Sequence, residues 1–98
     1  MIFSRMEFLS QTQLDQETLN ICVAEDWLVP GVSGPETEFT DADVARAILI
    51  RDLMNDMGVN AEGVGVILHL LDQMHGLRQA MAAVLQAKHR LLKPPDAE

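Results

Sequence analysis

The chain has 98 residues, 48% of them hydrophobic, which suits one folded domain or one small domain with a helical extension. Seven lysines and arginines against fifteen acids give a net charge of −8, the wrong sign for binding nucleic acid phosphates or an anionic membrane. The single cysteine, the lack of an apolar signal segment and the absence of any run of about 18 apolar residues favour a cytoplasmic protein.

The negative charge is concentrated in the first two thirds of the chain. Residues 1–62 carry twelve acids and three bases, whereas residues 63–98 carry three acids and four bases. Between Met6 and Ala45 there is no lysine or arginine, and we call these residues the base-free segment. Its nine acids are Glu7, Asp15, Glu17, Glu25, Asp26, Glu36, Glu38, Asp41 and Asp43. Acidic runs are often only solvated surface, but a run this long indicates a partner with a basic surface.

Two short helices are predicted first. Residues 5–13 form the first, and Asp15 is a favourable N-cap for the second, which we expect to continue to about Trp27. The apolar side chains that share one face of this second helix are Leu19, Cys22 or Val23, and Trp27. Residues 30–35 contain two prolines and two glycines, a turn-forming stretch that no helix crosses. Residues 36–39 are expected to form at most a short extended piece, too brief to define a strand.

A third, largely buried helix is predicted next. Thr40 and Asp43 form a capping box at its start, and Gly58 is expected to end it. We expect little polar surface between these points because most residues there are apolar: Val44, Ala45, Ala47, Ile48, Leu49, Ile50, Leu53, Met54 and Met57.

The fourth predicted helix carries the clearest pattern. Asn60 caps it, and no breaker follows until Pro94 and Pro95, so we expect a region 1–58, a helix over 59–93 and a disordered tail over 94–98. Spacings of three and four, interrupted by Lys88, define a coiled-coil seam typical of a homodimer, parallel or antiparallel. The residues of this predicted dimer interface are Ile67, Leu70, Met74, Leu77, Met81, Val84 and Leu91.

No constellation in the chain indicates an enzyme, a metal site or a cofactor site. His69, Asp72 and His75 fall at i, i+3 and i+6 and lack the H-E-x-x-H pattern of helical metal ligands. Cys22 lacks a basic neighbour and lies on an apolar face. Trp27 has two interpretations, a hydrophobic plug behind the second helix or an anchor for a partner.

The order of these elements resembles a MerR-type winged helix-turn-helix protein, an all-α fold with a long C-terminal coiled-coil dimerisation helix. Residues 17–20 (ETLN) and 28–30 (LVP) are similar to the second helix of that superfamily and its exit turn. Residues 56–72 (DMGVNAEGVGVILHLLD) resemble a stretch characteristic of one branch, the chaperone modulators called CbpM. The resemblance covers roughly residues 5–85.

DNA-binding members of the superfamily carry an arginine and tyrosines in the second helix and an arginine in the wing. The corresponding positions of this chain hold no cation: Asn20, Ile21 and Cys22, then Thr37, Glu38 and Phe39. Because lysine and arginine supply most of the affinity for phosphates, we expect the scaffold to have lost DNA binding.

The resemblance implies instead that the protein binds the J-domain of a DnaJ-like co-chaperone of the CbpA type and inhibits its stimulation of Hsp70. A basic J-domain helix would meet an acidic surface, whose expected residues are Glu17, Glu25, Asp26, Trp27, Glu36 and Glu38. Two alternatives stay open. One is a MerR-like transcriptional regulator that binds DNA through a positive patch around Arg46 and Arg51, and the other is an adaptor for an unrelated basic partner.

Overall fold

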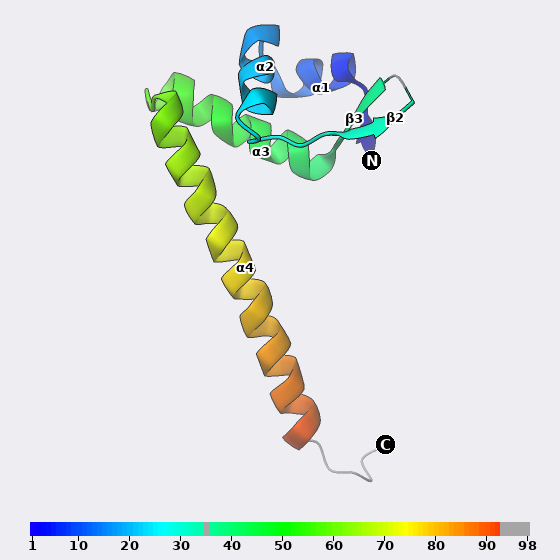
Figure 1. Ribbon diagram of the computed structural model, residues 1–98, viewed down its shortest axis with the longest axis vertical. Helices are drawn as coiled ribbons and strands as arrows, with labels where there is room; N and C mark the ends of the chain where they lie inside the picture. The colour runs from blue at the N-terminus through cyan, green and yellow to red at the C-terminus, as the bar shows by residue number, and fades with distance from the viewer. Residues whose placement is uncertain (35, 93–98) are drawn as a thin grey trace. The chain divides into compact units, whose positions relative to one another are not determined.

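The computed structural model describes residues 1–34 and 36–92, so Lys93 and the expected tail over 94–98 lie outside the described residues. It divides into two units, Met1–Val66 and a second that begins at Ile67. The fold is mostly helical, as predicted, with a small sheet. In chain order the elements are β1 (Ile2–Phe3), α1 (Arg5–Thr12), α2 (Gln16–Ala24), β2 (Gly31–Ser33), β3 (Glu36–Thr40), α3 (Asp41–Arg51), the π-helix η1 (Asp52–Asp56) and α4 (Ala61–Leu92) (Figure 1).

Local hydrogen bonds start every α-helix. The predicted cap of α2 is confirmed, since Asp15 Oδ1 accepts from the backbone amide of Thr18 at 2.7 Å. The predicted capping box of α3 is formed by Thr40 and Asp43, and Asn60 Oδ1 accepts from the amide of Gly63 at 2.8 Å at the start of α4. A further box, formed by Ser4 and Glu7, starts α1. Each cap satisfies amides that the first helical turn leaves unpaired.

Helix α2 ends at Ala24, so the prediction that it continues to Trp27 was wrong. Asp26 adopts a left-handed backbone conformation with φ 59°, and the amides of Trp27 and Leu28 both donate to the carbonyl of Cys22. This geometry ends a helix, and glycine is its usual marker. An aspartate at this position gives no such signal in the sequence.

The sheet is antiparallel in the order β1–β3–β2. Phe3 pairs with Phe39 across β1 and β3, and Val32 pairs with Thr37 across β2 and β3. The hairpin β2–β3 occupies part of the stretch expected to be only a turn, and residues 36–40 form a strand after all. Strands this short carry no alternating pattern, so pairing with distant segments decides them.

The core of the first unit is built around two stacked rings. Phe8 of α1 and Phe39 of β3 have centroids 4.1 Å apart and are fully buried. Leu19 and Cys22 from α2, Ile50 from α3 and Val64 from the start of α4 are also fully buried. Of the two alternatives for the inner face of α2, Cys22 is correct, because Val23 is exposed.

The third helix is less completely buried than predicted. Ala47, Ile50 and Leu53 lie in the core, but Ala45 is exposed and Met57 has 71% of its surface exposed. After Arg51 the helix continues as the π-helix η1. Gly58, with φ 69°, ends the helical segment as predicted. The π-helical turn shifts the direction of the last residues, which removes Met57 from the periodicity of a regular helix.

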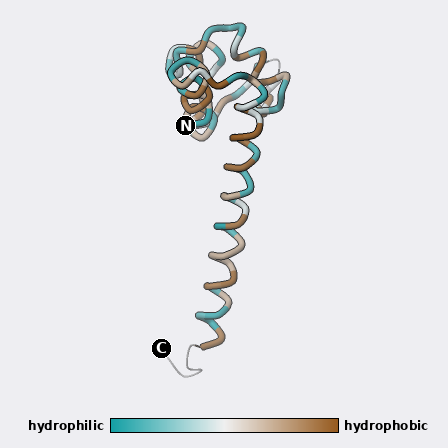
Figure 2. Tube along the Cα trace, turned by 90° about the vertical axis from the view of Figure 1, so that its left-hand side faces the viewer, coloured by the Kyte–Doolittle hydropathy of each residue, from teal (hydrophilic) through white to brown (hydrophobic). Residues whose placement is uncertain are grey.

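Helix α4 continues without interruption to Leu92. Apolar residues recur along it among polar ones (Figure 2). No helix among the described residues is long and apolar enough to span a bilayer.

Candidate protein-binding surface

Helix α2 presents a mixed acidic and apolar face to solvent. Glu17, Asn20, Ile21 and Ala24 follow helical spacing and are all exposed, whereas Leu19 and Cys22 on the opposite face are buried. The predicted contact residue Glu17 therefore lies at the start of an accessible ridge.

The C-terminal end of α2 carries two further predicted contact residues. Glu25 is the C-cap and Asp26 follows it, and both are exposed. The last turn contains no base. Because the C-terminal end of a helix carries partial negative charge, acids there oppose folding slightly. These two carboxylates thus stand where helix stability alone would favour a lysine or arginine.

The wing, which we define as the β2–β3 hairpin, contributes the remaining acids. Glu36 begins β3 and is exposed, while Glu38 is half-buried and pairs with Gly31 of β2. Residues two apart in a strand lie on the same face, so these two carboxylates lie on one side of the hairpin and Phe39 lies on the other.

Trp27 is not part of the accessible surface. Only 7% of it is exposed, its carbonyl accepts from Arg46 Nε, and its ring nitrogen lies 3.6 Å from where a Cβ on Gly65 would stand. Of the two interpretations of this residue, the hydrophobic plug is the one observed. We therefore leave Trp27 out of the candidate surface, which consists of the four exposed acids and Glu38.

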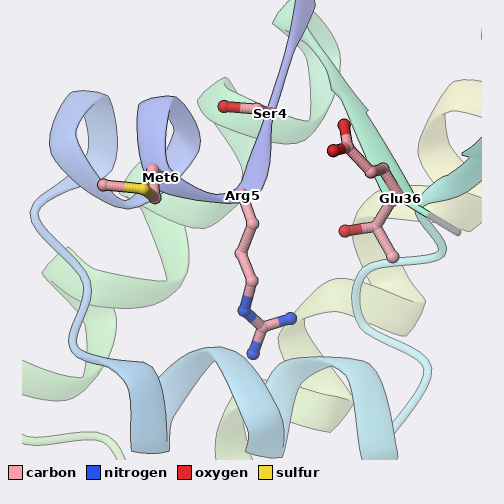
Figure 3. Close-up of a pocket in the computed structure, with 5 residues that line it drawn as sticks. Ser4, Arg5, Met6 and Glu36 are labelled. Atoms are coloured by element: carbon pink, nitrogen blue, oxygen red, sulfur yellow. The ribbon is translucent and has the colours of Figure 1, made fainter.

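A hollow of about 500 Å³ lies between the start of α1 and the wing. It is lined by Ser4, Arg5, Met6, Glu36 and Thr37 (Figure 3). Figure 3 shows the guanidinium of Arg5 directed toward α2, where its Nη2 donates to Asn20 Oδ1 at 3.0 Å and its Nε lies against the side-chain amide of Gln16. Arg5 is the only base among residues 1–45. Sequence reasoning missed it because it precedes the base-free segment by one position.

Two other arginines, considered as a positive patch for DNA, have structural roles. Arg51 Nη1 donates to the carbonyl of Thr12 at 2.8 Å, and its Nη2 lies 3.1 Å from Asp52 Oδ1. Arg46 donates to the carbonyl of Trp27. Both are half-buried and connect α3 to the segments that precede it.

The remaining chemically active side chains do not form a site in the described part of the chain. Burial raises the pKa of the Cys22 thiol to about 11, so it is protonated at neutral pH. His69 and His75 are exposed, and residues 1–34 and 36–92 contain no group of three or more side chains placed to hold a metal ion.

The predicted dimer interface lies exposed along α4. The exposed fractions are 54% for Leu70, 46% for Met74, 70% for Leu77, 63% for Met81, 64% for Val84 and 86% for Leu91, while Ile67 is half-buried. A contiguous apolar stripe of this kind on a helix usually marks a contact surface.

Two helices joined by a short turn, a second helix with an exposed face and a following β-hairpin define a winged helix-turn-helix protein. A family model described as MerR HTH family regulatory protein matches residues 3–86. The chain belongs to this family. No match to it was found among curated proteins.

Proposed function

We propose that this MerR-family protein acts by binding another protein, the J-domain of a DnaJ-like co-chaperone, and that it inhibits stimulation of Hsp70. The observation that carries the proposal is the charge of the surface that a helix-turn-helix protein normally presents to DNA. Glu17, Glu25 and Asp26 are exposed around α2, and Glu36 is exposed on the wing. A basic helix of a J-domain is complementary to this surface.

The mechanism requires no chemistry. The J-domain uses a basic helix to dock onto Hsp70, and a modulator that covers this helix prevents docking and lowers ATPase stimulation. The placement of Glu25 and Asp26 supports this view, because they weaken their own helix slightly and therefore fit a role in binding better than a role in folding.

We further propose that two copies of the chain pair through α4. The exposed residues from Leu70 to Leu91 keep the spacing of a coiled-coil seam. The test is light scattering on the wild-type chain and on Met81→Glu with Val84→Glu, which places carboxylates in an apolar seam and is expected to give monomers. Gln79→Glu with Gln86→Glu is the matched control, because these positions lie opposite the seam. A wild type that stays monomeric at high micromolar concentration contradicts the pairing.

Calorimetric titration of a purified CbpA-type J-domain into the full-length protein tests the proposed function, together with the ATPase activity of Hsp70 stimulated by that J-domain. We expect binding that weakens with salt and suppression of the stimulated ATPase. Undetectable binding by a folded protein refutes the proposal.

The second candidate is a DNA-binding transcriptional regulator. The family description and the position of Arg5 beside α2 favour it. Mobility shifts with duplex DNA at about 50 mM salt, where electrostatic binding is strong, distinguish the two. Salt-sensitive micromolar binding to duplex would replace the chaperone proposal.

A further inference from the structure

The hollow between α1 and the wing contains a positive charge in an otherwise acidic surface. Arg5 lines it together with Glu36, yet the structure shows no ion pair between Arg5 and any of the described residues. Its contacts are to the neutral side chains of Gln16 and Asn20. An arginine within an acidic domain that pairs with none of its carboxylates is in an unusual electrostatic position.

The donors of Arg5 are only partly used. A guanidinium has five N–H donors. The Gln16 side-chain oxygen accepts from Nε and Nη2, and Asn20 Oδ1 accepts from Nη2, so the two donors of Nη1 remain. The contact with Asn20 fixes the plane of the group and so orients the remaining donors beforehand. A guanidinium held in this way presents Nη1 in a fixed orientation, from which a carboxylate can accept a charged hydrogen bond.

The start of α1 does not itself need an external anion. Ser4 and Glu7 satisfy its first amides, since Glu7 Oε1 accepts from the amide of Ser4 at 2.9 Å. That hydrogen bond, followed by the one with the Ser4 side chain, holds the pKa of the Glu7 carboxyl below its usual value. A ligand in the hollow would therefore be bound by the Arg5 side chain and not by the helix end.

We propose that the hollow receives an aspartate or glutamate side chain of the protein partner, bound by Arg5, while the surrounding acids contact the basic residues of the same partner. This inference rests on the proposed function and adds a recognition element to it. Attraction between opposite net charges brings the partner to the surface, and the carboxylate contacting Arg5 sets its orientation. A cationic segment without a correctly placed carboxylate would leave Arg5 facing like charge, which gives the site specificity.

A DNA phosphate is the competing anion for the same guanidinium. The surroundings disfavour it, because Glu36 lines the hollow and Glu17 lies on the exposed face of the adjacent α2. A duplex brings a row of phosphates and would place several against these carboxylates, whereas a protein partner can present one carboxylate among bases.

The test uses the sign of a charge effect. Removing a positive charge from an acidic protein should tighten binding to a cationic partner if only overall attraction matters. Arg5→Gln should instead weaken binding of the CbpA-type J-domain to the full-length chain about tenfold, the size expected for a lost charged hydrogen bond. Arg90→Gln on the exposed side of α4 is the matched control and should leave affinity equal or slightly higher.

Two more variants separate recognition from folding. Asn20→Ala removes one of the two intramolecular partners of Arg5 and leaves Gln16, so it should change J-domain affinity much less than Arg5→Gln does. Arg5→Lys keeps the charge but not the planar group and should restore only part of the affinity. Circular dichroism melts establish that each variant is folded before titration.

The outcomes are distinct. If the wild type binds the J-domain and Arg5→Gln binds equally or more tightly, the inference is wrong and the proposed function stands. If the folded wild type does not bind, both are wrong. If the wild type binds duplex DNA and the Arg5→Gln variant does not, the anion that Arg5 binds is a phosphate and the inference is wrong.

Discussion

The two acids at the end of α2 allow binding and stability to be separated in one variant. We choose Glu25→Lys with Asp26→Asn, since Asp26 has a left-handed backbone that asparagine tolerates and lysine does not favour. The variant changes the charge at the C-terminal end of α2 by three units in the favourable direction for the helix. The same change removes two carboxylates from the candidate surface.

The expected magnitudes have opposite signs. A charge near a helix end contributes about 0.3–1 kcal/mol, so we expect stabilisation of about 1 kcal/mol after allowing for exposure to solvent. For a domain of this size that corresponds to a melting temperature about 4–8 °C higher. Exposed ion pairs are worth about 0.2–1 kcal/mol each, so the loss of two should lower J-domain affinity about 2- to 30-fold, mainly through slower association with a weaker salt dependence.

Thermal melts by circular dichroism and stopped-flow association at two salt concentrations measure the two effects. Asp56→Asn with Glu62→Lys is the matched control, because it makes the same charge change outside the candidate surface. Glu62 lies in the first turn of α4, where an acid is favourable, so this control should be less stable than the variant with Glu25→Lys and Asp26→Asn. It should also associate with the J-domain faster than that variant. Equal association rates for the two variants would refute the assignment of the surface to the end of α2.

Three further predictions concern the fold itself. Phe8→Ala removes one of two stacked, fully buried rings and should destabilise the first unit by about 3–5 kcal/mol in urea unfolding. The pKa of the Cys22 thiol is raised to about 11, so the protonated thiol contributes stability that is present below its ordinary pKa of 9.0 and is lost as pH rises through about 11. Iodoacetamide should therefore alkylate Cys22 far more slowly in the folded protein than in the urea-unfolded protein at pH 9. Hydrogen bonds from the side chain and then the backbone of Thr18 lower the pKa of the Asp15 carboxyl. The stability that they contribute is present above the ordinary pKa of 3.8 and is lost as pH falls through the lower pKa of the folded state. Asp15→Asn should therefore make stability less dependent on pH in an acid titration followed by circular dichroism.

Local signals determined how much of the fold the sequence could reveal. The caps formed by Asp15, Thr40 and Asn60 depend on neighbours three residues away, so the helix starts were predictable. The sheet requires β1 to pair with β3, although α1 and α2 separate these two strands along the chain. No short stretch of sequence indicates that pairing. The early end of α2 was missed because Asp26, and not a glycine, adopts the left-handed conformation.

The candidate surface, too, was only partly predictable from the sequence. Its acids were identifiable from composition, because a segment with nine acids and no lysine or arginine has an acidic exposed surface whatever its fold. The role of Arg5 was not, since it depends on α1 bringing this side chain against Asn20, fifteen positions later. Trp27 shows the converse, because a large aromatic beside acids resembles a partner anchor in sequence, whereas the turn after α2 directs it into the core.

The choice between a protein partner and DNA depends on how many cations a surface can supply. Each neutralised phosphate changes the slope of log affinity against log salt by about 0.9, and useful non-specific affinity requires several such contacts. On the α2 and wing surface Arg5 can supply one, since Arg46 and Arg51 are engaged within the first unit. That one phosphate contact is opposed by four exposed acids on the same candidate surface. A DNA-binding role would therefore need a different surface from the one that helix-turn-helix proteins normally use. A protein partner needs only one carboxylate for Arg5 and a few bases for the acids, and this is the complement that the exposed side chains define.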